Sequence, residues 1–248
     1  MPENPLIQQR KVVFCETLQS YPLARLLVQC SSCNRFFAAC CPDGSFGDDW
    51  ALPHDDDHPT CHHSKLVYTD GACTNNGSPH AKAGLGITIG GEHTFEDLEL
   101  KYSWSIPVDG TVDAAGPRTS QRAELLAALE GLKKLEKLDK LREASGYEDK
   151  EHTQLAMLQP HKQFDRATYI VVTDSEYVVK GITEWFPTWR RRGWRTSYGK
   201  EPTNLDLFMK LDEYVTTLED DKVAVGFWHI PRELNRNADA LAKRATGA

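Results

Sequence analysis

Three short apolar segments follow one another between residues 65 and 106. Residues 65–70 and 83–89 are apolar runs of the strand type, and residues 98–106 alternate apolar and polar positions with a period of two. That alternation is typical of a half-buried antiparallel strand. Because the connections are short, the pattern predicts three consecutive strands that form an antiparallel meander.

From Ser120 the period becomes helical, since leucines recur at every third position from Leu126 to Leu138 with charged residues among them. Thr119 or Ser120 can cap the start of this helix, and its leucine face is expected to lie in the core. Residues 142–166 are polar and have no clear period, which predicts a long loop or insertion.

The last third of the chain mixes strands and helices. Residues 168–174 form a continuous apolar run, typical of a strand buried on both faces. Helices are expected from Ser175 and over residues 204–218, followed by a strand at 223–230 and a last helix from Asn235. This order predicts an α/β fold in which a five-stranded mixed sheet carries helices on its faces.

The composition excludes several classes of protein. With 40% hydrophobic and 26% charged residues among 248, the chain has the content of a globular protein. It contains no run near the roughly 18 apolar residues of a transmembrane helix, and its N-terminus lacks the layout of a secretory signal. We therefore expect an intracellular protein without a membrane partner, in the nucleus, the mitochondrion or the cytoplasm. The net charge of −7 disfavours nucleic acid on average, so the distribution of charge matters more than its sum.

A change of composition near residue 64 divides the chain. Residues 43–60 are rich in Gly, Pro and Asp, which is typical of a loop, and the strand-type pattern starts directly afterwards. We predict a small N-terminal module over residues 1–64 and a larger domain over residues 65–248.

Cysteine and histidine are concentrated in the N-terminal module, where six of the seven cysteines lie. Cys30 and Cys33 have the spacing of a zinc knuckle, and Cys61 and His63 can supply a second pair of ligands after the loop. We expect one structural Zn²⁺ ion on these four residues. Within this hypothesis, Cys40, Cys41 or His62 could take the place of His63 as the fourth ligand. In the other interpretation no zinc binds, and the cysteines are small buried hydrophobic residues.

Four carboxylates occupy positions typical of a reactive site. Asp70 and Asp174 each follow an apolar strand, and Glu124 and Asp239 each lie in the first turns of a predicted helix. Taken singly, each is explained as a turn residue or as a charge that complements a helix dipole. If the fold brings the four together, they repel one another unless cations hold them, which predicts a divalent-metal site.

Short motifs around these carboxylates resemble the four blocks of type 1 ribonuclease H, in the same order along the chain. The four motifs are YTDGAC at residues 68–73, QRAE at 121–124, TDS at 173–175 and NADALA at 237–242. Residues 181–201 also resemble the basic protrusion of the cellular eukaryotic enzymes. The resemblance covers about residues 65–248 and implies a ribonuclease H-like fold with the order βββαβαβα.

The resemblance implies an endonuclease that cuts the RNA strand of RNA–DNA hybrids with two Mg²⁺ ions and leaves 5′-phosphate and 3′-hydroxyl ends. By analogy, Asp70 bridges both ions, Asp239 helps to hold the ion that activates water, and Glu124 and Asp174 hold the ion that faces the leaving group. The donor types agree, because ligands that are all oxygen select Mg²⁺ or its substitute Mn²⁺. We expect the enzyme to act as a monomer.

Residues 180–200, which we call the basic protrusion, carry six basic residues and one acidic residue, a local charge of +5. Such a run is often only a solvated helix face. Here, however, three tryptophans are interspersed, and aromatic side chains beside arginines suit the sugars, bases and phosphates of a nucleic acid. Arg190, Arg191 and Arg192 are the phosphate-binding candidates, and at least one tryptophan is expected in the core.

Similarity to the family suggests further contacts with the hybrid. It assigns Tyr177 and Trp185 to the channel of the DNA strand. Three residues would cradle a DNA phosphate: Arg118, Thr119 and Asn204. Three others would read the minor groove on the RNA side, where they can bond a 2′-hydroxyl: Asn76, Ser120 and Gln121.

The chain departs from the family pattern at three points. The arginine of the phosphate pocket is displaced to Arg118, and Ser120 stands where asparagine is common. The loop before Asp239 contains no histidine, so no general-acid histidine is assigned; His229 is expected on the preceding strand. Two other functions stay open: a binding protein that has lost its chemistry, which the four retained carboxylates disfavour, and another metal nuclease of the superfamily, which the basic protrusion disfavours.

Overall fold

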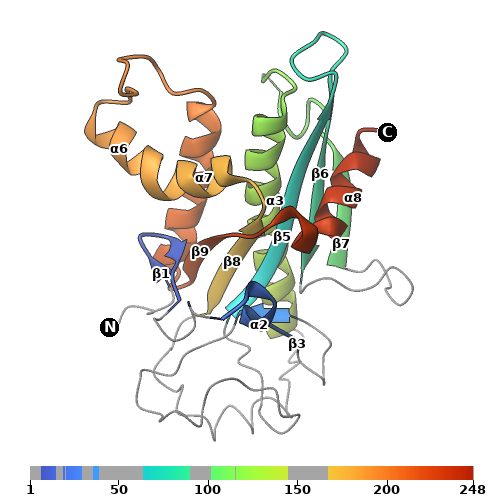
Figure 1. Ribbon diagram of the computed structural model, residues 1–248, viewed down its shortest axis with the longest axis vertical. Helices are drawn as coiled ribbons and strands as arrows, with labels where there is room; N and C mark the ends of the chain where they lie inside the picture. Colours follow the sequence, from blue (N-terminus) through green and yellow to red (C-terminus); the bar gives the residue numbers. More distant parts are fainter. Residues whose placement is uncertain are drawn as a thin grey trace, which may run out of the picture.

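The computed structural model describes residues 7–14, 19, 21–29, 36–38, 64–89, 102–114, 116–144 and 167–247. A twisted sheet runs through the middle of the molecule (Figure 1), with the strand order β1–β2–β9–β8–β5–β6–β7. Its strands are β1 (Ile7–Gln8), β2 (Lys11–Val12), β9 (Ala224–His229), β8 (Thr168–Thr173), β5 (Ser64–Thr74), β6 (Lys82–Ile89) and β7 (Ser103–Pro107). β5, β8 and β9 are parallel to one another, whereas β6 and β7 complete the predicted antiparallel meander.

Helices cover both faces of this sheet (Figure 1). The long helix α3 (Ser120–Ala144) packs on β5 and β6, and α7 (Leu205–Asp220) lies beside it. The helix α8 (Arg236–Ala245) packs on the opposite face of β6. Between β8 and α7 the chain forms three short helical segments, which are α5 (Glu176–Lys180), the π-helix η4 (Gly181–Trp185) and α6 (Phe186–Arg191).

The alternation of side chains along β5 explains the two hydrophobic layers. Val67 belongs to the larger core below α3 and α7, whereas its neighbours Leu66 and Tyr68 belong to a second cluster on the other face. All three are at most 2% exposed. Ala238 of α8 and Phe14 of the N-terminal segment cover this second cluster.

The five predicted strands and the ribonuclease H-like order are confirmed, and the sheet contains two strands that the sequence pattern did not predict. β2 pairs in parallel with β9, and β1 pairs with β2, so an N-terminal hairpin extends the sheet at its edge. A short helix, α2 (Leu23–Leu26), and a separate pair of strands, β3 (Leu27–Gln29) and β4 (Phe36–Ala38), follow. The division of the chain at residue 64 stays a prediction, although residues 7–12 belong to the main sheet.

The helix boundaries agree with the local signals. Thr119 caps α3, since its Oγ1 accepts a hydrogen bond from the backbone N–H of Arg122 at 3.3 Å. α3 continues to Ala144, so the start of the predicted 142–166 loop is helical. Residues 145–166 lie outside the described residues. Among the described helices, none is both long enough and apolar enough to cross a membrane.

Candidate active site

The first two carboxylates meet because Gly71 lets β5 and α3 approach closely. A Cβ at position 71 would lie 2.2 Å from the backbone nitrogen of Glu124, a distance that no side chain can occupy. Glycine is therefore required here by packing. Asp70 on β5 and Glu124 near the start of α3 lie side by side, and the charge of Asp70 adds to burial in raising the pKa of Glu124.

Asp174 is held by a buried asparagine that the sequence analysis did not single out. Asp174 follows β8, and its Oδ1 accepts a hydrogen bond from Asn235 Nδ2 at 2.6 Å. The same amide donates to the backbone oxygen of Thr69 at 3.0 Å. Asn235, which is 1% exposed, therefore links the end of β8 to β5 and directly precedes α8.

Asp239 completes the group from α8. This helix lies close against β6 because position 86 is a glycine, and a Cβ there would lie 1.9 Å from the backbone oxygen of Ala238. The carboxylate of Asp239 accepts a hydrogen bond from Arg232 on one oxygen and one from Lys243 at 2.6 Å on the other. Arg232 belongs to the 3₁₀ turn η5 (Arg232–Leu234), in the segment between β9 and α8.

The electrostatics show that the four carboxylates form one group. Burial, together with the charges of Asp174 and Asp239, raises the pKa of Asp70 to about 6, while Arg232 opposes this rise. Burial and the charges of Asp70 and Asp174 raise the pKa of Glu124 well above its usual value. Burial also disfavours ionisation of Asp239, but the bonds from Lys243 and Arg232 outweigh it and lower its pKa.

These oxygen donors fit a divalent cation. Glu124 Oε2 is buried and has no hydrogen-bond partner among the described residues, which leaves one oxygen available for an ion. Within the described part of the chain, no three acidic, cysteine or histidine side chains are already arranged as a metal site. Arg232, Lys243 and Asn235 instead bind the carboxylates.

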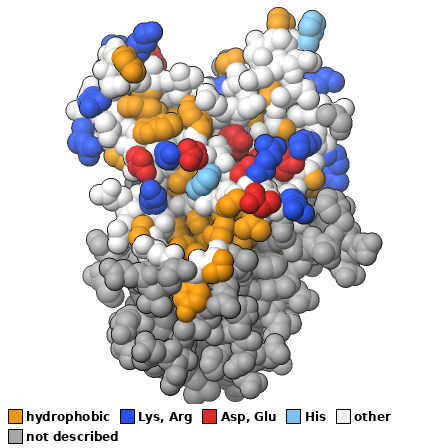
Figure 2. Space-filling model, in the orientation of Figure 1, with side chains coloured by type: hydrophobic (Ala, Val, Ile, Leu, Met, Phe, Trp, Pro, Cys, Tyr) orange, Lys and Arg blue, Asp and Glu red, His pale blue; other side chains and the backbone are white. Residues whose placement is uncertain are grey.

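Figure 2 shows acidic side chains in the middle of one face, with Lys and Arg side chains on both sides of them. Above them the surface is hollowed between two lobes, one of which carries α6. His229 is the last residue of β9, as expected. Its Nε2 lies 3.3 Å from the backbone oxygen of Asp174, and no bond from it to a described carboxylate is formed.

The basic protrusion rests on an aromatic cluster. Tyr177 contacts Trp185 and Phe208 with ring centroids 5.9 and 5.5 Å apart, and Trp189 contacts Phe208 at 5.3 Å. Trp189 and Trp194 are partly buried against the core, which confirms that at least one tryptophan there is structural. Trp185 is 36% exposed and is accessible to a ligand.

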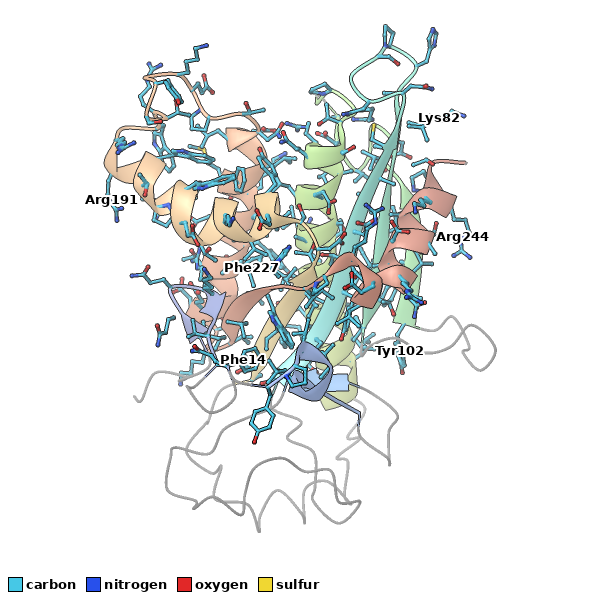
Figure 3. The ribbon with its side chains drawn as sticks, in the orientation of Figure 1. Phe14, Lys82, Tyr102, Arg191, Phe227 and Arg244 are labelled. Carbon is cyan, nitrogen blue, oxygen red and sulfur yellow. The ribbon has the colours of Figure 1, made fainter. Side chains whose placement is uncertain are left out.

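The three arginines of the basic protrusion have different surroundings. Arg190 forms an ion pair with Asp212, and its guanidinium lies over the ring of Phe186 at 5.1 Å. Arg191 points outward from α6 (Figure 3), and it donates to Thr188 Oγ1 at 3.2 Å. Arg192 is exposed. All three arginines are exposed, but Arg190, whose side chain is 56% exposed, is held by Asp212 and Phe186, whereas Arg191 and Arg192 have no ion pair among the described residues.

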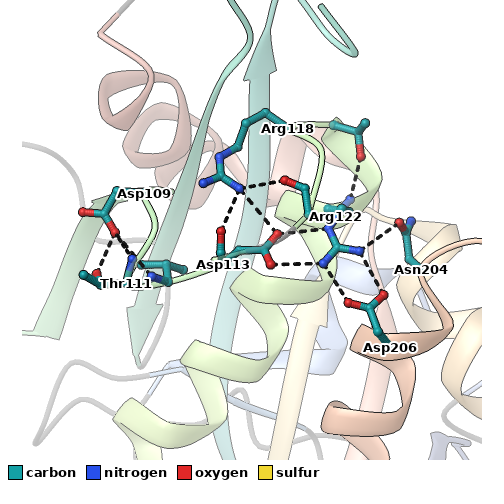
Figure 4. Close-up of polar contacts among 10 residues, drawn as sticks. Asp109, Thr111, Asp113, Arg118, Arg122, Asn204 and Asp206 are labelled. Atoms are coloured by element: carbon teal, nitrogen blue, oxygen red, sulfur yellow. Dashed lines mark hydrogen bonds and ion pairs between the residues drawn. The ribbon is translucent and has the colours of Figure 1, made fainter. Parts of the chain in front are cut away.

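The expected phosphate cradle is organised by an ion-pair network (Figure 4). Arg122 binds Asp113 on one side and Asp206 of α7 on the other, with Nη2–O distances of 3.1 and 2.8 Å. Arg122 also approaches Asn204 Oδ1 at 3.5 Å, while Asn204 Nδ2 donates to the hydroxyl of Tyr177 at 3.1 Å. The structure thus joins Asn204 to Tyr177 and to the start of α3.

Arg118 and Asn76 also lie beside the start of α3. Arg118 donates to the backbone oxygens of Asp113 and Gly116, both at 3.0 Å, so its guanidinium is held by its own loop. Asn76 Oδ1 accepts a hydrogen bond from the backbone N–H of Ser120 at 3.1 Å. Asn76 and Ser120 therefore lie together, and the neighbouring Gln121 is exposed.

Sequence reasoning missed three residues that contact the carboxylates, namely Arg232, Asn235 and Lys243. Their one signal in the sequence was position, since Arg232 and Asn235 lie in the segment before α8 and Lys243 follows Asp239 by one helical turn. The four expected zinc ligands, Cys30, Cys33, Cys61 and His63, lie outside the described residues.

Known proteins resemble this chain in sequence. The RNase H family model matches residues 62–246. Ribonuclease H of Pseudomonas entomophila is 34% identical over 184 residues, which cover 72% of this chain and 90% of that protein. Ribonuclease H1 of Mus musculus is 30% identical over 184 residues, and these cover 73% of this chain and 49% of the mouse protein. The chain thus spans about half the length of the mammalian relatives. The solved RNase H domain of PFV aligns with a TM-score of 0.46 at 22% identity, covering 74% of this chain and 94% of that one.

Proposed function

Because the chain belongs to the ribonuclease H family, we propose that it is an endonuclease that hydrolyses the RNA strand of RNA–DNA hybrids. The observation that carries the proposal is the convergence of Asp70, Glu124, Asp174 and Asp239 on one site. Burial and charge repulsion raise the pKa of Asp70 and of Glu124. A group that is costly to ionise in the isolated protein is expected to bind cations.

We propose that the four carboxylates hold two divalent ions, Mg²⁺ or Mn²⁺. Two such ions supply an activated water and stabilise the charge on the departing oxygen, so that the products carry 5′-phosphate and 3′-hydroxyl ends. The chain itself contributes the positions of the ligands. Gly71 sets the separation of β5 and α3, and Asn235 orients Asp174.

The surrounding residues support a role in binding the hybrid. Trp185 and the exposed Arg191 and Arg192 lie on the lobe at one side of the carboxylates, where they suit the DNA strand. Asn76, Ser120 and Gln121 are grouped at the start of α3 and present short amide and hydroxyl groups, which suit an RNA 2′-hydroxyl. We propose that the protein binds the hybrid as a monomer.

The test is to incubate the protein with end-labelled RNA–DNA hybrid, duplex RNA and duplex DNA, each with and without Mg²⁺ or Mn²⁺. The expected result is cleavage of the RNA strand of the hybrid alone, and only with a divalent ion. Asp70→Asn should abolish cleavage. Asp220→Asn, which removes the same charge from the exposed end of α7, should not. Absence of cleavage by the wild-type chain, or normal cleavage by Asp70→Asn, would overturn the proposal.

A further inference from the structure

The N-terminal hairpin of β1 and β2 lies outside the residues that match the family, 62–246, yet it is built into the main sheet. Lys11 is in register with Phe227, and the backbone N–H of Phe227 donates to the oxygen of Arg10 at 2.8 Å. Phe14, just after the hairpin, is 8% exposed and packs edge-on against Trp228 at 5.1 Å. The hairpin is therefore fixed to β9.

Arg10, in the turn of this hairpin, forms a network on α7. Its guanidinium donates to Asp212 Oδ1 at 2.6 Å, to both oxygens of Glu219 at 3.0 and 2.7 Å, and to Thr216 Oγ1 at 3.0 Å. The side chain of Arg10 is 19% exposed and that of Asp212 is 14% exposed. Forked, partly buried pairs of this kind are stronger and better oriented than surface ion pairs.

Asp212 connects this network to the basic protrusion. While Oδ1 binds Arg10, Oδ2 binds Arg190. The Arg190 guanidinium in turn lies over the rings of Phe186 and Trp194, at 5.1 and 5.9 Å. One carboxylate thus joins a cation of the N-terminal hairpin to a cation of the protrusion. A second contact, between Lys11 and Glu184 of η4 at 3.0 Å, is almost half exposed on both sides and is expected to contribute little.

We infer that Arg10 is a positioning residue for hybrid binding, and that the N-terminal hairpin braces the basic protrusion through Asp212. This inference rests on the proposed function. Arg10 neutralises Asp212, which contacts Arg190 of the protrusion, and this negative charge would otherwise repel the phosphates of the hybrid. It also fixes Asp212, which holds Arg190 on its aromatic rings. Removal of Arg10 leaves Arg190 to neutralise Asp212 alone and loosens the segment that carries Arg191 and Arg192.

The variants separate this role from a general contribution to stability. Arg10→Ala removes the contacts of Arg10 with both Asp212 and Glu219. Glu219→Ala removes only the contact with Glu219, which does not reach the basic protrusion. Lys11→Ala removes the same charge from the same hairpin. Hybrid affinity is measured without divalent ions over a range of salt concentrations, the kcat and KM of cleavage with Mg²⁺ are measured alongside, and thermal unfolding is recorded for each variant.

Arg10→Ala should weaken hybrid binding about threefold to tenfold at low salt, the net range of one ordinary hydrogen bond, because Arg10 acts on the hybrid only indirectly. It should raise KM without lowering kcat to match. Arg10→Lys should restore part of the affinity. Glu219→Ala and Lys11→Ala should bind within about twofold of wild type, although Glu219→Ala also unfolds at a lower temperature. In an Asp212→Ala background, Arg10→Ala should have no further effect on affinity.

Hydrogen exchange of residues 186–200 without nucleic acid tests the brace independently of hybrid binding. Exchange should accelerate there in Arg10→Ala and not in Glu219→Ala. The inference is overturned if Arg10→Ala binds hybrid as wild type does, if Glu219→Ala weakens binding equally, or if exchange in the protrusion does not change. If wild-type protein binds no hybrid at all, the proposed function fails. The exchange experiment alone then shows whether Arg10 holds the basic protrusion in place.

Discussion

Replacement of Asp70 by asparagine is expected to stabilise the metal-free protein while it removes activity. Asp70 is 5% exposed, and burial together with the charges of Asp174 and Asp239 raises its pKa from 3.8 to about 6. An acid whose pKa is raised by folding costs stability when it is ionised. That cost is absent below about pH 4, grows between pH 4 and pH 6, and is complete above pH 6.

The magnitude follows from the same two pKa values. The change from 3.8 to about 6 corresponds to about 3 kcal/mol at neutral pH. Asparagine has nearly the same shape and no charge, so Asp70→Asn should recover much of this energy and raise Tm at pH 7 by roughly 5 to 10 °C for a domain of this size. Neutralising Asp70 also removes a charge that repels ionised Glu124, whose pKa is raised by burial and by the charge of Asp70.

Thermal unfolding of both proteins with EDTA, from pH 4 to pH 8, measures the effect. The stability advantage of Asp70→Asn should be near zero at pH 4 and largest above pH 6. Adding Mg²⁺ or Mn²⁺ should stabilise the wild-type protein more than the variant, because binding to the native state adds stability. Asp220→Asn should show neither effect. An Asp70→Asn protein that is less stable than wild type at pH 7 without divalent ions would refute the reasoning.

Individual side chains lead to four further predictions. Replacing both Arg191 and Arg192 with alanine should flatten the plot of log binding constant against log salt concentration, by roughly 0.9 for each phosphate that is no longer neutralised. The rate of single-turnover cleavage should not change, and an unchanged slope would exclude both arginines as phosphate ligands. Gly71→Ala should destabilise the protein by about 3 kcal/mol in denaturant unfolding, because its Cβ meets the backbone of α3; wild-type stability would contradict the close packing. Arg232→Ala should tighten Mn²⁺ binding in calorimetry without nucleic acid, because it removes a cation bound to Asp239; weaker binding would show that Arg232 orients that carboxylate. Elemental analysis of protein purified without chelator should find about one zinc per chain; none, with all thiols reduced, would exclude the N-terminal zinc site.

The elements with strong local signals could be predicted from the sequence. The apolar runs predict β5, β6, β8 and β9, and the leucine period predicts α3, because each of these segments buries a face that its own sequence defines. The β1–β2 hairpin could not be predicted in this way. Each of its strands has two residues, too few for a period, and it is stabilised by partners more than 200 positions away along the chain.

The candidate active site, like the fold, has some features that the sequence predicts and others that only the structure shows. The four carboxylates could be proposed because the sequence pattern places each where a strand ends or a helix begins, although β5 continues past Asp70 to Thr74. Only the fold shows that Asn235 and Arg232 bind two of them. The charge of the basic protrusion could be counted, whereas the commitment of Arg190 to Asp212 depends on a helix that lies beyond the protrusion in sequence. Contacts between distant segments leave no periodic signal.

Analysis of the ends produced from a hybrid in Mg²⁺ tests the central claim most directly, because it reports which nucleophile attacks the phosphate. Attack by water should leave a 5′-phosphate on one RNA fragment and a 3′-hydroxyl on the other, with the DNA strand intact; the four carboxylates would hold the divalent ions that activate this water. Fragments that end in a 2′,3′-cyclic phosphate or a 3′-phosphate would show attack by the neighbouring 2′-hydroxyl and would contradict the account.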